Sequence, residues 1–179
     1  MSQFLTLKTT HGDIKIRFRD DVAPSTCKAM RQLVSSKMYD GCCFYRAEPG
    51  FVIQGGLRLP DGSIRDSPVG KLPLEYKIPN TRGTVTMARW GEPDSATSEW
   101  FINLNTNTNL DRYTVRIAPM RGLLAVLGEV VSPEPKCTAG ELTTRTAQTK
   151  PVNGGLDAEA IRIERTLWTD KDCSQRYLR

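Results

Sequence analysis

The chain of 179 residues contains one histidine, His11, and this scarcity restricts the chemistry open to it. Because there is no second histidine, no Ser-His or Cys-His arrangement can form away from His11. The neighbours of His11 in the sequence do not make it a general base. Cysteine and histidine pairs with zinc-ligand spacing are missing as well. The phosphate-binding patterns GxxxxGK and GxGxxG do not occur. We therefore expect neither a metal nor a cofactor.

Paired cysteines are also missing. The five cysteines are odd in number, no CxxC motif occurs, and adjacent Cys42 and Cys43 would point to opposite faces of a strand. These features argue against a disulfide framework and favour free thiols in a reducing compartment.

Long apolar runs are absent, so we expect no transmembrane helix and no membrane partner. The first twenty residues carry charges throughout, from which we expect no signal peptide. The default location is then cytoplasmic, with a nuclear or organellar pool left open.

Neither sign of charge dominates: 25 basic and 20 acidic residues give a formal net charge of +5. Basic residues alternate with apolar ones over residues 14–18, which is typical of a strand with one solvated face. We therefore interpret the charge as a source of solubility, with nucleic-acid binding the less favoured interpretation. RNA binding stays open only for the basic C-terminal residues Arg162, Arg165, Lys171, Arg176 and Arg179.

What the chain does contain is mostly β patterning. Residues 4–9 and 13–18 predict a hairpin around Thr10-His11-Gly12. Residues 23–34 predict a helix, with Pro24 in its first turn and apolar residues at helical spacing. Further short strands are predicted at 42–46, 51–54, 84–88, 99–104, 123–130 and 160–164. This pattern favours an antiparallel barrel or sandwich with a helix over an open end.

The length fits one domain, which we place at residues 1–168. Within it, residues 132–158 are rich in Thr, Pro and Gly and predict an irregular insertion with at most a short helix near 137–146. Residues 169–179 are predicted to form a C-terminal tail.

Two segments concentrate the residues of a candidate site. Residues 44–56 combine Arg46 and Gln54 with several apolar side chains, and residues 87–102 have the same character. Together they predict a shallow apolar pocket with a single fixed cation at its rim. Such a site suits a substrate whose bond geometry changes without any bond being broken.

These segments resemble the cyclophilin family of peptidyl-prolyl cis-trans isomerases. The resemblance runs from about Phe4 to Val131 and resumes in the last predicted strand. It is carried by Phe44-x-Arg46, Pro49 to Gly56, Asn80 to Arg89, Pro93 to Ser98, Phe101-Ile102-Asn103, Leu110-Asp111 and Gly128-Glu129-Val130. It implies a mainly β fold: an eight-stranded antiparallel β-barrel capped by one or two α-helices.

The resemblance also implies a function and site residues. Arg46 would be the catalytic residue of a prolyl isomerase that assists protein folding, as a monomer acting on proline-containing peptides and proteins. Gln54 and the backbone of Ala88 and Arg89 would hold the substrate main chain. The pocket for the proline ring would consist of Phe51, Val52, Phe101 and Leu110.

Three further substrate-binding positions depart from the family pattern. Glu99 stands where glutamine is usual, Asn109 where an aromatic residue is usual, and Leu124 where histidine or tyrosine is common. Glu99 places a carboxylate near Arg46, where it could hold the arginine in place or divert it from the substrate. The loss of an aromatic ring at Asn109 should weaken the binding of cyclosporin-type ligands.

Two functions from different classes therefore stay open. One is an active isomerase, and the other is a binding or adaptor module for proline-containing segments with weak or lost catalysis. Arg46 and the apolar pocket favour the first, whereas Glu99, Asn109 and residues 132–158 favour the second. The geometry at Arg46 discriminates between them. A guanidinium that reaches an open pocket supports catalysis, and a bidentate clamp by Glu99 argues against it.

Overall fold

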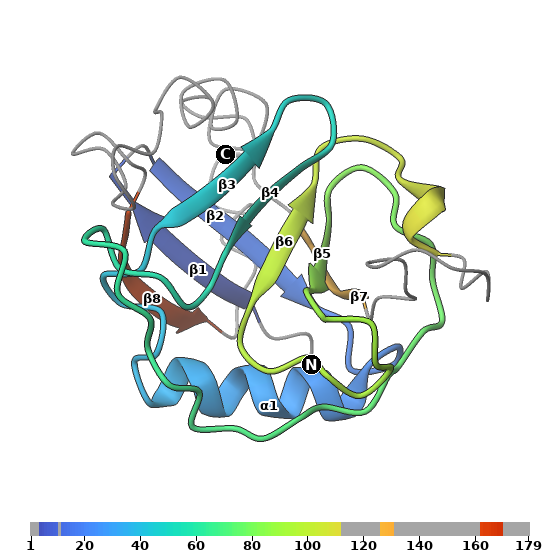
Figure 1. The fold of residues 1–179 in the computed structure, drawn as a ribbon, viewed down its shortest axis with the longest axis horizontal. Coiled ribbons are helices and arrows are strands. Elements are labelled where there is room, and N and C mark those ends of the chain that lie inside the picture. Colours follow the sequence, from blue (N-terminus) through green and yellow to red (C-terminus); the bar gives the residue numbers. More distant parts are fainter. Residues whose placement is uncertain (1–3, 11, 112–125, 131–161, 170–179) are drawn as a thin grey trace, which may run out of the picture.

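The computed structural model describes residues 4–10, 12–111, 126–130 and 162–169 of the chain (Figure 1). These ranges contain eight strands, all paired antiparallel, in the sheet order β3-β4-β6-β5-β7-β2-β1-β8. The strands are β1 (Phe4–Thr9), β2 (Gly12–Phe18), β3 (Phe44–Glu48), β4 (Val52–Gly55), β5 (Thr84–Met87), β6 (Trp100–Asn103), β7 (Val126–Val130) and β8 (Ile163–Thr169). The mainly β class predicted from the sequence is confirmed.

The two outer strands of the sheet, β3 and β8, approach each other at one end. Cys43 forms an isolated bridge with Arg162, and the amide of Ile163 donates to the carbonyl of Cys42 at 2.7 Å. Gly41 donates in turn to the carbonyl of Ile163 at 2.7 Å. Within the described residues these contacts do not extend into a ladder between β3 and β8. The eight strands are therefore established, whereas the predicted closed barrel is not confirmed.

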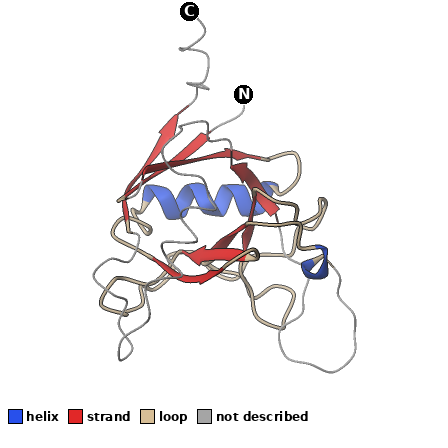
Figure 2. Cartoon of the chain, turned by 90° about the horizontal axis from the view of Figure 1, so that it is seen from above, coloured by secondary structure: helices blue, strands red, loops and turns tan. Residues whose placement is uncertain are grey.

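The α-helix α1 (Pro24–Ser35) lies along one end of the strands (Figure 1). Seen from above, strands lie on both sides of it (Figure 2). Its buried face includes the apolar residues predicted from their helical spacing, and consists of Thr26, Cys27, Ala29, Met30, Leu33 and Val34. No described helix has the length and apolar character needed to cross a membrane. The predicted helix near 137–146, the insertion at 132–158 and Leu124 lie outside the described residues.

The start of the helix is capped from a distance. Ala23, at the N-cap, has no side chain that can accept a hydrogen bond. The carboxylate of Glu75 takes over this task, accepting from the amides of Ser25 at 3.1 Å and Thr26 at 2.8 Å and from the hydroxyl of Thr26 at 2.8 Å. A residue about fifty positions away in the chain therefore satisfies the first turn of α1.

The register of β3, β4 and β6 places three different functional groups in one row. Gln54 on β4 pairs with Arg46 on β3 and with Phe101 on β6. Because directly opposed residues share a face of a sheet, a cation, an amide and an aromatic ring lie side by side there. The opposite face carries Ile53 and Ile102, which join the main hydrophobic core.

The last strand differs from its prediction. The sequence pattern predicts a strand at 160–164, whereas β8 covers Ile163–Thr169. Its extent follows from its partner, because β1 offers six residues as an edge and β8 pairs along all of them. The alternation of apolar residues within 160–164 could not reveal the length of that edge.

Candidate active site

A pocket of about 460 Å³ opens over β3, β4 and β6. This volume is within the range of pockets that bind small ligands, roughly 300–1,000 Å³. All the predicted site residues line it except Asn109 and Leu124. The lining residues are Tyr45, Arg46, Phe51, Val52, Gln54, Leu57, Arg58, Ile64, Ala88, Arg89, Trp90, Thr97, Glu99, Phe101 and Leu110. Asn109 is exposed and is not part of the lining, and Leu124 lies outside the described residues.

One side of the pocket is apolar. Val52 and Phe101 are buried and form a hydrophobic cluster separate from the main core. Phe51, Ala88 and Leu110 pack against this pair while remaining partly exposed. The cluster is therefore a surface that an apolar ring can cover, and its members are those predicted to hold a proline ring or the main chain beside it.

Buried amides hold the wall of this apolar surface in place. The side chain of Asn107 donates to the carbonyl of Phe51 at 2.9 Å and to the side chain of Asn103 at 2.8 Å. Asn103 donates onward to Asn80 at 3.1 Å, and Asn80 donates to Asp111 at 2.7 Å. Buried polar groups that are all paired in this way make a rigid support. The sequence pattern did not predict this role for the asparagines.

Arg46 lies at the edge of the pocket with 47% of its side chain exposed. Its Nη1 donates to Oε1 of Gln54 at 3.2 Å, and its Nε reaches Oε1 of Glu48 at 3.5 Å. Among the described residues no ion pair joins Arg46 to Glu99. The clamp that would have argued against catalysis is therefore not formed.

Glu99 contacts Tyr45, a residue that the sequence pattern did not predict to be in the site. The hydroxyl of Tyr45 donates a short hydrogen bond to Oε1 of Glu99, and Nε2 of Gln54 donates to that hydroxyl at 2.6 Å. Burial, reinforced by the Glu99 carboxylate, raises the pKa of Tyr45 well above its ordinary value, so the phenol stays protonated.

Strict alternation on β3 would turn Tyr45 away from the face that carries Arg46. The register between β3 and β4 shifts between Phe44 and Arg46, and such a bulge lets consecutive side chains face the same side. A bulge has no signature in residues 42–46 taken alone. This is why Tyr45 could not be placed in the site from the sequence.

The pocket is lined by more than the single cation that the sequence predicted. Arg58 lies with its guanidinium carbon 5.1 Å from the centre of the Tyr45 ring, and Arg89 also lines the pocket. Nη1 of Arg89 donates to the backbone carbonyls of Trp90 and Glu92 at 2.8 and 2.9 Å, which fixes the turn after β5. The prediction of one cation was therefore wrong. Arg58, which follows β4, and Arg89, which follows β5, also line the pocket.

The rim of the pocket carries two exposed apolar side chains, Ile64 and Trp90, with 58% and 67% exposure. Trp100 on β6 is buried instead, with its ring edge-on to Tyr39 and Phe44 at centroid distances of 6.1 and 5.5 Å. Trp100 therefore packs in the core, whereas Trp90 borders the pocket.

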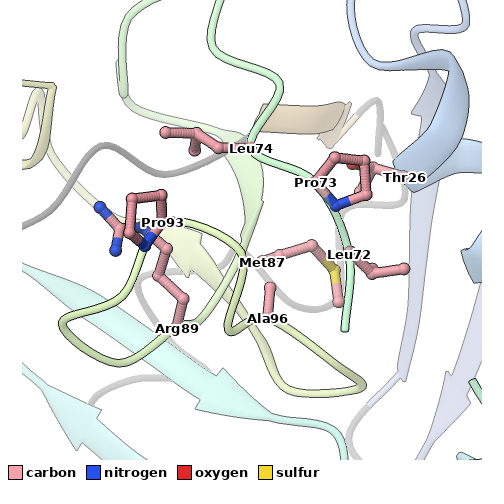
Figure 3. A pocket seen from close by; sticks show the side chains of 8 residues that line it. All are labelled: Thr26, Leu72, Pro73, Leu74, Met87, Arg89, Pro93 and Ala96. Atoms are coloured by element: carbon pink, nitrogen blue, oxygen red, sulfur yellow. The ribbon is translucent and has the colours of Figure 1, made fainter. Parts of the chain in front are cut away.

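A second, much smaller pocket lies next to Arg89 (Figure 3). Its volume of about 10 Å³ is close to the space that one water molecule needs. It is lined by Thr26 of α1, by Leu72, Pro73 and Leu74, and by Met87, Arg89, Pro93 and Ala96. It is too small for a substrate side chain, so the larger pocket is the candidate active site.

Comparison with known proteins agrees with this fold. Residues 4–150 match the family model described as cyclophilin type peptidyl-prolyl cis-trans isomerase/CLD. The chain therefore belongs to the cyclophilin type family. Peptidyl-prolyl cis-trans isomerase A of Dickeya dadantii (strain 3937) is 39% identical over 111 residues, covering 62% of this chain and 58% of that protein. The chain thus spans less than two thirds of that relative.

Solved structures support the fold. The crystal structure of a Cryptosporidium parvum cyclophilin type peptidyl-prolyl cis-trans isomerase matches with a TM-score of 0.73 at 21% identity, covering 96% of this chain and all of that one. A structure of the same protein in the presence of the dipeptide Ala-Pro matches with a TM-score of 0.70 at 20% identity, covering 94% of this chain and 99% of that one.

Proposed function

We propose that this protein is a peptidyl-prolyl cis-trans isomerase that accelerates rotation about Xaa-Pro bonds. The observation that carries the proposal is the placement of Arg46, whose half-exposed guanidinium lies beside an apolar surface and is held by Gln54. Membership of the cyclophilin type family and the name of its Dickeya relative agree with it.

The reaction needs what this pocket offers. The peptide bond before proline has partial double-bond character and a rotation barrier of roughly 18–20 kcal/mol. Twisting the bond makes the prolyl nitrogen pyramidal and gives it a lone pair, which a guanidinium N–H of Arg46 can approach. Such a donor stabilises the twisted state more than the planar one, and only that difference accelerates rotation. Neither a nucleophile nor a proton transfer takes part.

The substrate class follows from the two sides of the pocket. We propose that the proline ring covers Val52 and Phe101 while the main chain beside it binds Gln54 and the backbone of Ala88 and Arg89. The presence of the dipeptide Ala-Pro with the Cryptosporidium protein supports proline-containing peptides as ligands. Asn109 contributes no aromatic ring to the pocket, so we propose that cyclosporin-type ligands bind weakly.

The adaptor alternative is the less favoured one. It was favoured by Glu99, Asn109 and residues 132–158. Of these, Glu99 does not clamp Arg46, because its carboxylate accepts a hydrogen bond from Tyr45. Arg46 is left beside an open pocket with Gln54 as its neighbour. A protein that only held proline segments would not need a donor kept in that position.

The test is an isomerisation assay on a Xaa-Pro peptide, comparing the wild type with Arg46→Ala and Arg46→Lys. We expect Arg46→Ala to lose at least about tenfold in kcat/KM, equivalent to about 1.4 kcal/mol of transition-state stabilisation. Arg46→Lys should also be impaired, because lysine lacks the planar fork of donors. Arg82→Ala, at an exposed arginine outside the pocket, is the matched control. A folded wild type that binds the peptide without accelerating its isomerisation would favour the adaptor function.

We further propose that the eight strands close into a barrel and that the protein assists folding as a cytoplasmic monomer. The bridge between Cys43 and Arg162 supports closure, since it joins the two outer edges of the sheet. Buried free thiols at Cys42 and Cys43 suit a reducing compartment. Cross-strand NOEs between β3 and β8 test the closure, sedimentation analysis tests the monomeric state, and cell fractionation tests the location.

A further inference from the structure

We propose that Tyr45 is a positioning residue, whose hydroxyl group, anchored by Glu99, orients Gln54 so that its amide oxygen faces Arg46. The inference rests on the proposed isomerase function and adds two residues, Tyr45 and Glu99, to the apparatus that holds Arg46. It also assigns a role to Glu99, the residue that stands where glutamine is usual in the family: it anchors the hydroxyl of Tyr45.

The two ends of this chain of contacts determine the direction of every hydrogen bond in it. A carboxylate such as Glu99 only accepts, so the proton between it and Tyr45 comes from the phenol. The phenol oxygen is then left to accept, and it does so from Nε2 of Gln54 at 2.6 Å. The other end of the Gln54 side chain is its carbonyl oxygen, which accepts from Nη1 of Arg46 at 3.2 Å. A guanidinium only donates, so each partner is of the required kind.

A carboxylate at position 99, in place of an amide, makes this direction unique. If Glu99 were a glutamine, its amide could donate to Tyr45 as well as accept from it. Tyr45 could then donate to Gln54, whose amide could turn its NH2 group toward Arg46. Two donors would then face each other, and Arg46 would lose its partner. The carboxylate of Glu99 removes that second arrangement.

The ring of Tyr45 is itself held in place. The bulge in β3 turns it toward the pocket, and the guanidinium of Arg58 lies over it at 5.1 Å. A further contact of Arg46, from its Nε to Oε1 of Glu48 at 3.5 Å, leads away along β3 toward solvent. Without an acceptor on Gln54, Arg46 would turn to this exposed carboxylate and to water.

The first experiment compares Tyr45→Phe in two backgrounds, the wild type and Gln54→Ala. Phenylalanine keeps the ring and its contact with Arg58 but removes the hydroxyl group. We expect kcat/KM to fall about three- to tenfold in the wild-type background, the scale of one net hydrogen bond of about 0.5–1.5 kcal/mol. The loss should lie more in kcat than in KM, because the twisted state is what needs Arg46, whereas the planar substrate contacts Gln54 alone of the two. In the Gln54→Ala background the same change should have no further effect.

Tyr76→Phe is the matched control, since Tyr76 is a partly exposed tyrosine outside the pocket, and its kcat/KM should equal that of the wild type. The conservative change Glu99→Gln is the second test. It should lower kcat/KM less than Tyr45→Phe does and have no effect once Tyr45 is replaced. If Tyr45→Phe fails to fold, the comparison of Glu99→Gln in the wild-type and Gln54→Ala backgrounds answers the same question.

A readout without activity separates this proposal from the proposed function. The side-chain amide signals of Gln54 in a ¹⁵N correlation spectrum, assigned by their loss in Gln54→Ala, should shift in Tyr45→Phe and Glu99→Gln and stay constant in Tyr76→Phe. If the wild type is inactive but these shifts occur, the isomerase function fails and the positioning by Tyr45 stands. Unchanged Gln54 signals, or equal losses of activity with and without Gln54, would overturn the role of Tyr45.

Discussion

At the scale of single residues, Gly56 shows how closely one backbone position controls the site. Its φ angle is +123°, a conformation that other residues rarely adopt. A Cβ at this position would lie 2.6 Å from the carbonyl oxygen of Ser98 and 3.0 Å from the Cα of Glu99. Gly56 therefore lets the end of β4 approach the segment Ser98–Glu99 that leads into β6.

Replacing Gly56 by alanine should destabilise the protein by at least about 2 kcal/mol, from the clash together with the unfavourable φ angle. Gly50→Ala is the control, because Gly50 also has a positive φ of +71°, yet a methyl group added there would meet no atom within 4 Å apart from its chain neighbours. That variant should lose only about 1 kcal/mol, the conformational term alone. Urea unfolding of both variants measures the difference, and equal losses would contradict the steric argument.

Tyr45 and Arg46 mark the limit of what the sequence could predict at this scale. The motif around Arg46, Gln54 and Phe101 was enough to predict the members of one pocket. Their partners were not predictable, because the bulge at Tyr45 and the contact with Glu99 depend on how β3, β4 and β6 pair. Local alternation contains no information on that pairing.

At the scale of elements, the hairpin and helix followed from local signals. The turn residues after Thr9 and the alternation up to Phe18 predicted β1 and β2 nearly to their ends, and Pro24 marked the first residue of α1. β8 was misplaced by several residues, since its length is dictated by β1. The capping of α1 by Glu75 could not be predicted from the sequence either, because Glu75 lies far from α1 in the chain and only the fold brings them together.

The contribution of the Glu75 cap to stability should depend on pH. Burial disfavours the ionised form of Glu75, but the hydrogen bonds from Thr26 and Ser25 outweigh this and lower its pKa. A lowered pKa means that the carboxylate stabilises the fold above its unfolded-state pKa, about 4.3, and that this stability is lost as the pH falls through the folded-state pKa.

Glu75→Gln should therefore lose about 0.5–2 kcal/mol at pH 7, the usual range for a helix cap, because one of its two acceptor atoms becomes a donor. The gap between wild type and variant should narrow below about pH 4. Denaturant unfolding of the wild type and the variant, at pH 7 and below about pH 4, measures this difference in the free energy of unfolding. Glu92→Gln, at an exposed position, is the control. A gap of the same size at both pH values would show that the charge of Glu75 is unimportant.

At the scale of the whole molecule, the chain returns near its end to a segment far earlier in the sequence. β8 pairs with β1 and also contacts the connection between α1 and β3. Asp40 strengthens this contact, because its Oδ1 accepts from the amide of Thr166 at 2.9 Å and from its hydroxyl at 3.0 Å. Residues more than 120 positions apart are thereby joined at the edge of the sheet.

Asp40→Ala should destabilise the protein by about 1–3 kcal/mol, because the partly buried amide of Thr166 loses its acceptor. In Asp40→Ala the amide of Thr166 should also exchange with solvent faster than it does in the wild type. The amide of Val85, a buried residue of the central strand β5, serves as the internal reference. Asp66→Ala, at an exposed aspartate, is the control and should leave both quantities unchanged. Equal stability of the two variants would mean that this contact is dispensable.

The two described tryptophan side chains give the molecule an optical signal of its own. Trp90, two-thirds exposed, borders the pocket, whereas Trp100 is 1% exposed and sealed among aromatic rings. A peptide that covers the rim would remove water from the indole of Trp90 and shift its emission to shorter wavelength, while Trp100 would stay constant. Occupancy of the pocket can thus be followed by fluorescence in the unlabelled protein, with Trp90→Phe as the variant that loses the signal.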